Sequence, residues 1–198
     1  MSAASVLYAR DVVNPGTAGL TVLAHARWPA PGSEAEQAPR PLAGFVISSF
    51  SPLVAHVAES CLRRRHGTAP PIDARTAERT GIVVASTHGD MATALAVAQA
   101  VDGGGRVSPL LFFQSAPTAV AGHLATRWGL AGPVVSTSPN GNALADGLAD
   151  AALLIEDGDA DEVLLVAAEQ ARSRGERDAA VALIVAADGG LTGQEGIA

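Results

Sequence analysis

Few residues of this chain are placed where they could act as a nucleophile or a base. Ser136 and Ser138 follow a predicted strand, at the kind of turn where many α/β enzymes carry a nucleophile, and His88 or His123 could serve as the base. Such a pair would give a small serine-dependent acyl hydrolase or acyltransferase. The turn-forming residues 139–141 explain the two serines equally well as parts of a plain turn.

The thiol of Cys61, the single cysteine of the chain, is a weaker candidate. It lies on the apolar side of a predicted helix, whereas a thiolate is stabilised at a helix N-terminus. We therefore predict a small buried side chain. The five histidines have no ligand-type spacing with this cysteine, so no metal site is predicted. The phosphate-binding and dinucleotide-binding glycine motifs are missing too, and no cofactor is predicted.

All basic residues are arginines, and Arg63–Arg65 are consecutive. With 13 basic against 20 acidic residues and a formal net charge of −7, the chain lacks the basic surface of a nucleic-acid-binding protein. The arginine run is either a solvated helix end or a docking point for an acidic partner, such as a phosphopantetheine carrier. The unpaired cysteine and the lack of a leader pattern or a bilayer-spanning stretch predict a cytoplasmic protein.

The elements that must position these residues follow from the apolar pattern. The 198 residues, 48% of them hydrophobic, predict a single domain over 1–198 with a surface loop at 29–41. Helices are expected from Ser51 to the arginine run and at 91–101, 118–128 and 142–156, strands at 6–8, 20–25, 80–86, 134–137, 162–168 and 179–187, and an irregular stretch at 110–113. Buried strands alternating with helices predict an α/β layered domain with a mixed, largely parallel sheet.

A set of short motifs occurs in a fixed order between Thr80 and Glu169. A buried strand leads to a glycine-containing turn and a helix, and the motifs that follow are Val107-Ser108-Pro109, Ala121-Gly122-His123-Leu124, Gly129-Leu130-Ala131-Gly132-Pro133 and the strand from Val163 to Glu169. This ordered set resembles the N-terminal half of a β-ketoacyl synthase, a condensing enzyme of the thiolase fold. The resemblance implies a layered thiolase-like fold, a mixed sheet covered by helices.

The resemblance also implies which catalytic parts are missing. Family enzymes carry an active cysteine at the N-terminus of the helix after the Gly-Pro strand, where the helix dipole stabilises its thiolate. This sequence has residues 137–142 there, TSPNGN, and Asn140 or Gly141 is expected at the degenerate nucleophile position. The family's C-terminal half, with the two histidines that promote decarboxylation, is also expected to be absent. No catalytic residue is therefore assigned.

What remains resembles a chain length factor, a ketosynthase homologue that pairs with an active ketosynthase as a heterodimer. The segment 85–91 is similar to short ketosynthase-like proteins of aryl polyene and highly reducing type II polyketide synthases. The implied role is non-catalytic: to shape the tunnel for a growing polyene or polyketide chain while the partner condenses it with malonyl carrier protein. The substrate would arrive on the phosphopantetheine of an acyl carrier protein, a transient partner. Neither nucleic acid nor membrane is expected as a partner.

The same resemblance implies which side chains line that tunnel. Those facing the partner's tunnel or its rim are Leu111, Phe112, Phe113, Gln114, Ser115 and Ala116, and those forming its floor are Met91, Ala94 and Leu95. A few side chains at the end of a dry channel can set chain length, because each added carbon unit gains about 1 kcal/mol until it clashes. A stand-alone acyl-binding or carrier-binding module is the remaining alternative.

Overall fold

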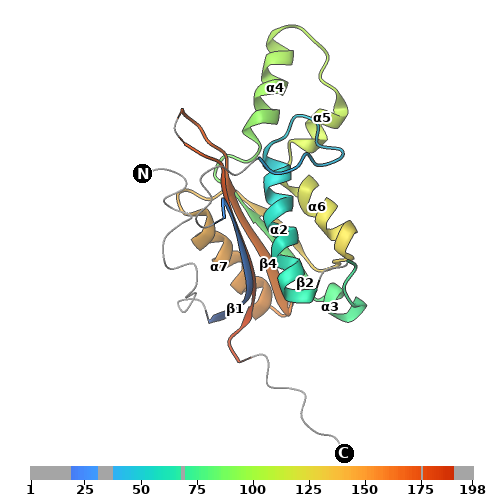
Figure 1. Ribbon diagram of the computed structural model, residues 1–198, viewed down its shortest axis with the longest axis vertical. Coiled ribbons are helices and arrows are strands. Elements are labelled where there is room, and N and C mark those ends of the chain that lie inside the picture. Colours follow the sequence, from blue (N-terminus) through green and yellow to red (C-terminus); the bar gives the residue numbers. More distant parts are fainter. Residues whose placement is uncertain (1–18, 31–37, 68–69, 175, 190–198) are drawn as a thin grey trace, which may run out of the picture.

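A five-stranded mixed sheet forms the centre of the protein (Figure 1). The computed structural model describes residues 19–30, 38–67, 70–174 and 176–189. Across the sheet the strands follow the order β1 (Leu20–Trp28), β5 (Ala179–Ala187), β4 (Glu162–Glu169), β2 (Thr80–Ala85) and β3 (Val134–Thr137). β2 is parallel to β3 and β4, whereas β5 is antiparallel to β4 and β1. The sheet is mixed, as predicted, but only half of its strand pairs are parallel.

Helices cover both faces of this sheet (Figure 1). α2 (Phe50–His66) and α6 (Pro117–Trp128) lie on one face, and α7 (Ala143–Glu156) lies on the other. The short α3 (Ala74–Glu78) precedes β2. α4 (Met91–Asp102) and α5 (Pro109–Gln114) project beyond one end of the sheet (Figure 1). The predicted α/β layered architecture is therefore confirmed. In the described ranges, no helix is both long and apolar enough to cross a membrane.

The apolar runs of the central strands supply two cores, one on each face. Every residue of β2 and β4 is buried. Because successive side chains of a strand point to opposite faces, Ile82 and Leu164 contribute to the core under α2 and α6. Val83 and Leu165 contribute to the core under α7. Continuous hydrophobic strands are thus explained by burial on both sides.

Small residues let α7 lie close to the sheet. At Gly147 in the middle of this helix, an added Cβ would lie 2.5 Å from Cδ1 of Leu165 and 3.2 Å from the Cβ of Ala85. Contacts this short do not fit a side chain, so a glycine is required where helix and strands meet. The small side chains of this alanine-rich, aromatic-poor chain allow such a close approach of helix and sheet.

Most predicted elements are present, and two differences have a clear physical cause. The stretch 110–113, predicted to be irregular, is part of α5, which begins at Pro109, because proline is favoured at the first position of a helix. α3 was not predicted because its five residues are too short for a periodic signal. The strand predicted at 20–25 is β1, paired with β5, and the strand predicted at 6–8 lies outside the described residues. Of the predicted loop 29–41, residues 29–30 and 38–41 are neither helix nor strand, and 31–37 lie outside the described residues.

Candidate functional site

Polar residues gather where the parallel strands end. The carboxyl ends of β2, β3 and β4 meet at one edge of the sheet, beside α4 and α5. A hollow of about 530 Å³ opens there, lined by the loop 86–90, by Ala94 and Val97 of α4, by Phe112 of α5, by Ser115 and Pro117 after it, and by residues 136–138. We call it the acyl hollow, after the tunnel role expected of its walls. Its lining combines hydroxyl groups at the base with apolar side chains at the top.

The loop at the base of the acyl hollow is held by the end of β4. The backbone N–H of Thr87 donates to Oε1 of Glu169 over 2.6 Å, and that of Met91 donates to Oε1 of Gln170 over 2.7 Å. Both side chains are buried. The amide nitrogen of Gln170 also donates to the Ser49 hydroxyl over 2.5 Å. The loop is therefore fixed to a central strand by hydrogen bonds that cannot be exchanged freely for water.

The contacts of Glu169 and Gln170 were not predicted from the sequence. Glu169 was noted only as the end of a family motif, and Gln170 carried no signal. Their partners lie 79 to 121 residues away in the sequence. The parallel pairing of β2 with β4 brings Thr87 and Met91 close to these two side chains, and the packing of α2 on the sheet brings Ser49 close to Gln170.

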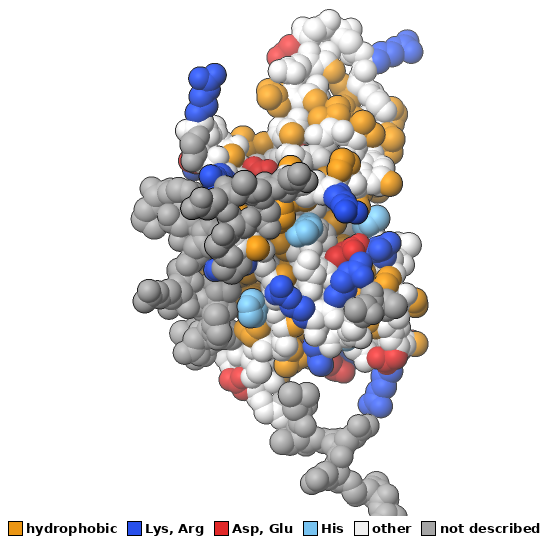
Figure 2. All heavy atoms as spheres, viewed as in Figure 1, with side chains coloured by type: hydrophobic (Ala, Val, Ile, Leu, Met, Phe, Trp, Pro, Cys, Tyr) orange, Lys and Arg blue, Asp and Glu red, His pale blue; other side chains and the backbone are white. Residues whose placement is uncertain are grey.

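The side chains expected to line a tunnel are divided between two cavities. Phe112 and Ala94 contact the acyl hollow, and Phe112 is 71% exposed. Phe113, 66% exposed, and Gln114, only 5% exposed, lie instead at a second groove of about 790 Å³ between α5 and α6. Ser115, which is half-buried, also lines the acyl hollow. Of the other predicted residues, Leu95 and Ala116 are exposed, and Met91 and Leu111 are half-buried. Figure 2 shows hydrophobic side chains gathered over this end of the molecule.

No nucleophile–base pair forms around the two candidate serines. The Ser138 hydroxyl donates to the backbone carbonyl of Thr87 over 3.1 Å. Nε2 of His88 lies 3.2 Å from Nη1 of Arg172, and because a guanidinium only donates, this imidazole nitrogen acts as the acceptor. His123 lies at the other groove, on α6. The hydrogen bonds of the described residues do not give Ser138 a histidine base, so the geometry does not favour the serine-enzyme interpretation.

α7 is the helix before which the degenerate nucleophile position is expected. α7 starts after Asn142, whose side chain accepts a hydrogen bond from the N–H of Ala145 over 3.2 Å. Asn140 and Gly141, the predicted degenerate positions, lie just before it and are exposed. Cys61 lies far along α2 and is fully buried, as predicted. Burial raises the pKa of its thiol to about 12, so it stays protonated and unreactive at neutral pH.

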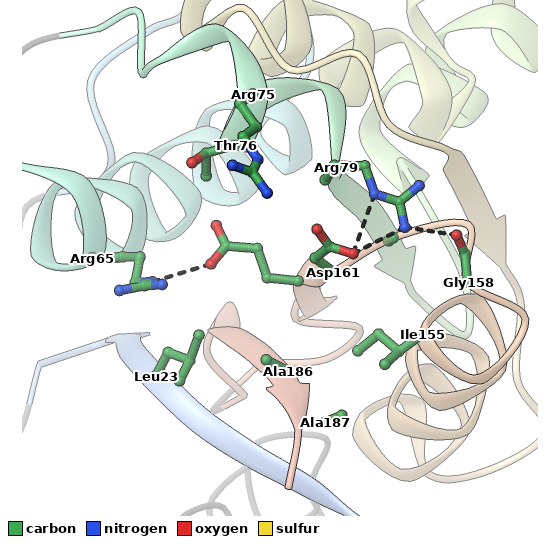
Figure 3. Close-up of a pocket in the computed structure, with 12 residues that line it drawn as sticks. Leu23, Arg65, Arg75, Thr76, Arg79, Ile155, Gly158, Asp161, Ala186 and Ala187 are labelled. Carbon is green, nitrogen blue, oxygen red and sulfur yellow. Dashed lines mark hydrogen bonds and ion pairs between the residues drawn. The ribbon is translucent and has the colours of Figure 1, made fainter. Parts of the chain in front are cut away.

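A charged cavity of about 420 Å³ lies at the opposite, amino end of β2 and β4 (Figure 3). Nε of Arg65 lies 3.1 Å from a Glu162 carboxylate oxygen. The Arg79 guanidinium donates to Asp161 over 2.9 Å and to the carbonyl of Gly158 over 2.6 Å. Two carboxylates and the carbonyl of Gly158, which lies just after α7, thus compensate these positive charges. We assign no ligand to this cavity. The ion pairs around it connect the ends of α2 and α3 to the start of β4.

The arginine run at the end of α2 is also satisfied within the chain. The guanidinium groups of Arg63–Arg65 contact, in order, the Glu59 carboxylate, the His25 carbonyl and the Glu162 carboxylate. This favours the interpretation as a helix end over that as a docking point. Among the residues that the structure describes, no three histidine, cysteine or acidic side chains are grouped so that they could hold a metal ion.

Comparison with known proteins agrees with this geometry. The family model for the β-ketoacyl synthase N-terminal domain matches residues 47–175, more than half of the chain. No curated protein matches the sequence significantly.

Solved structures with a similar fold include three assemblies. A chain of the ketosynthase (ApeO) in complex with its chain length factor (ApeC) from Xenorhabdus doucetiae has 22% identity and a TM-score of 0.63, and the match covers 85% of this chain and 79% of that one. A chain of the ishigamide ketosynthase/chain length factor has 19% identity and a TM-score of 0.59, covering 79% of this chain and 48% of that one. AntDE:AntF, a type II acyl carrier protein in complex with its ketosynthase bound to the hexaketide, matches with 16% identity and a TM-score of 0.58, covering 85% and 62%.

The chain thus spans most of the first of these structures and about half of the second. At such identities the likeness establishes the fold, which is the thiolase-like fold of ketosynthases. Together with the family match over residues 47–175, it shows that this chain belongs to the β-ketoacyl synthase N-terminal domain family.

Proposed function

We propose that this protein is a non-catalytic chain length factor, which pairs with an active ketosynthase and shapes the tunnel for the growing chain. The observation that carries the proposal is the exposed apolar surface of α4 and α5. Apart from Thr93, Gln99 and Asp102, every residue of α4 is apolar, yet Thr93 is its only buried residue. A helix that is apolar all round is stable in water only when another surface covers it. We infer that this surface belongs to a ketosynthase.

The edge strand β3 supports the same partner. Among the residues that the structure describes, β3 pairs only with β2, which leaves its other side as an open sheet edge, and Val134 on this strand is 43% exposed. An open edge next to an exposed apolar patch invites pairing with another chain. A partner that adds a strand to β3 and covers α4 and α5 would bury both features at once.

The absence of a usable thiol supports a non-catalytic role. A condensing enzyme of this family needs a thiolate at the N-terminus of the helix that corresponds to α7, and residues 137–142 contain no cysteine. The thiol of Cys61, with a pKa of about 12, is enclosed in the core. We therefore assign acyl transfer and decarboxylative condensation to the partner.

Similar proteins favour this assignment and suggest the substrate. Two of the similar structures are named as ketosynthase and chain length factor assemblies, and a third contains an acyl carrier protein. We propose by analogy that the chain grows on malonyl units delivered on the phosphopantetheine of a carrier protein, with no further cofactor. A polyene product and a cytoplasmic location remain predictions from the sequence.

The test is co-expression with a ketosynthase that carries the family's active cysteine, chosen from the genome that encodes this chain, followed by sizing of the complex and an extension assay with malonyl carrier protein. We expect a stoichiometric heterodimer that extends chains only when both subunits are present. Phe112→Asp should abolish the complex, because a charge would be buried in the interface. The matched control is Leu153→Asp, since Leu153 is also an exposed apolar residue, 56% exposed, but lies on α7. A stable monomer that no ketosynthase binds would overturn the proposal.

A further inference from the structure

The weak attachment of α4 to the rest of the protein raises the question of what fixes its direction. Only Thr93 of this helix is buried, and its closest helical neighbour is the equally exposed α5. Ala94 and Val97 of α4 form a wall of the acyl hollow. Apolar packing inside the chain is therefore too slight to set the position of this wall.

Polar contacts at the first turn of α4 fix the direction of the helix instead. Asp90, 3% exposed, caps the helix through the N–H and the hydroxyl of Thr93, at 3.1 and 2.6 Å. The N–H of Met91, the first residue of α4, donates to the side-chain oxygen of Gln170. Four residues before Met91, the N–H of Thr87 donates to Glu169. Both ends of the connecting loop are thus bound to two consecutive buried side chains at the end of β4.

Gln170 extends this link to a third element. Its amide nitrogen donates to the hydroxyl of Ser49, the residue before α2. A serine at this position normally accepts a hydrogen bond from its own helix, but Ser48 does so instead, taking the N–H of Ser51 over 2.8 Å. The Ser49 hydroxyl can therefore accept the hydrogen bond from the Gln170 amide. Since α2 is packed into the core along most of its length, the start of α4 is tied to two rigid elements.

We propose that Glu169 and Gln170 are positioning residues that fix the direction of α4 and so set the depth of the acyl hollow. The inference rests on the proposed function, because depth matters only if an acyl chain enters. A side-chain amide that accepts at one end and donates at the other holds its two partners at a defined separation. Without it, α4 turns about its first residue and the wall at Ala94 and Val97 recedes. Longer chains then fit, and their lengths become less uniform.

The test uses the full chain in complex with its ketosynthase. Gln170→Met keeps the length of the side chain, but its thioether accepts only weakly from the N–H of Met91 and cannot donate to Ser49. We expect the share of products of wild-type length to fall at least about twofold, with longer products appearing. Gln99→Met is the matched control, because Gln99 is exposed on α4; it should leave the product lengths as they are.

A second pair of variants shows whether Glu169 acts through its hydrogen bond to Thr87 or through its negative charge. Glu169→Gln keeps an oxygen that accepts from the N–H of Thr87 and should behave as wild type, whereas Glu169→Met should resemble Gln170→Met. Amide hydrogen exchange of the uncomplexed full chain gives a readout that needs no partner. Gln170→Met should speed exchange along α4 at least about threefold and leave α2 and α7 unchanged.

The outcomes distinguish this inference from the proposed function. If the wild-type chain binds a ketosynthase and controls product length, but Gln170→Met changes neither length nor exchange along α4, the positioning role is wrong. If the wild-type chain has no ketosynthase partner, the proposed function fails. Exchange along α4 in the free chain then decides alone whether Glu169 and Gln170 fix this helix.

Discussion

Cys61 shows how burial removes the reactivity of a side chain. Its thiol is enclosed by the core of α2, and burial raises its pKa to about 12. At pH 8 only about one molecule in ten thousand carries the thiolate, the species that attacks electrophiles. A cysteine that packs well and barely ionises behaves as a small hydrophobic residue.

We therefore expect iodoacetamide to label Cys61 slowly in the native protein and rapidly in urea. Cys61→Ala should lower the free energy of unfolding by about 1 kcal/mol, because only one sulfur atom is lost from the core. The same variant should leave chain extension by the ketosynthase complex unchanged. Rapid labelling of the native protein, or loss of extension in Cys61→Ala, would show that the thiol is used.

Glu162 is the most densely contacted carboxylate of the described residues. Its oxygens lie 2.9 Å from Nε2 of His66 and 3.1 Å from Nε of Arg65, and one accepts from the Thr80 hydroxyl over 3.2 Å. Burial alone would raise the pKa of this group, but His66 and Arg65 outweigh burial and hold the pKa below its ordinary value of 4.5. The charged form is therefore favoured in the folded state.

This shift predicts the direction of the acid response. A carboxyl group whose folded-state pKa is depressed contributes stability above its unfolded pKa, and this stability is lost as pH falls through the folded value. Glu162→Gln should cost about 1–3 kcal/mol at pH 7 and make the free energy of unfolding fall less steeply between about pH 5 and pH 3. Urea unfolding at several pH values measures both effects, with Glu156→Gln, exposed on α7, as control. Parallel pH profiles for Glu162→Gln and wild type would contradict the assignment.

At the scale of secondary-structure elements, β3 has two different sides. One side is hydrogen-bonded to β2, and the other is an open edge in the part of the chain that the structure describes. The carbonyls of Pro133 and Thr137 accept hydrogen bonds from the N–H groups of Ile82 and Ser86, on the β2 side. Backbone groups of alternate residues in a strand point to opposite sides. Those of Ser136 therefore face the open edge, where a partner strand would bind.

Proline at this position tests that edge. Ser136→Pro removes one outward N–H but none of the bonds to β2, so the isolated chain should keep its fold, with a cost of about 1 kcal/mol or less. Affinity for the ketosynthase should fall at least about tenfold, which calorimetry or sizing can measure. Ser136→Ala, which keeps the N–H, should bind normally. Equal binding by Ser136→Pro would mean that the partner does not pair with β3.

The sequence predicts individual helices and strands better than it predicts which of them lie side by side. The continuous apolar runs of β2, β4 and β5 indicate buried strands, and the buried position of Cys61 follows from helical periodicity alone. The insertion of antiparallel β5 between β4 and β1 depends on pairing across distant parts of the chain, which no local pattern encodes. For the same reason the contacts of Gln170 were not predictable.

At the scale of the whole molecule, the two ends of the sheet differ in character. Most of the large apolar side chains exposed in the described residues lie on α4 and α5: Leu95, Val101, Leu110, Phe112 and Phe113. The opposite end carries the paired arginines and carboxylates around Arg79 and Glu162 (Figure 3). An apolar patch concentrated at one end favours a single, oriented partner over indiscriminate association.

This asymmetry predicts how stability depends on the partner. A ligand that binds only the folded chain adds about 2.7 kcal/mol when its free concentration is a hundred times Kd, which for a chain of this size raises Tm by about 5–10 °C. We expect the ketosynthase to produce such a shift, and Phe112→Asp to abolish it without lowering the Tm of the isolated chain. Thermal unfolding of the chain, labelled with a fluorophore and titrated with unlabelled ketosynthase, measures the shift; Leu153→Asp is the control. If Phe112→Asp were stabilised as much as wild type, the partner would have to bind elsewhere, and the apolar end formed by α4 and α5 would need another explanation.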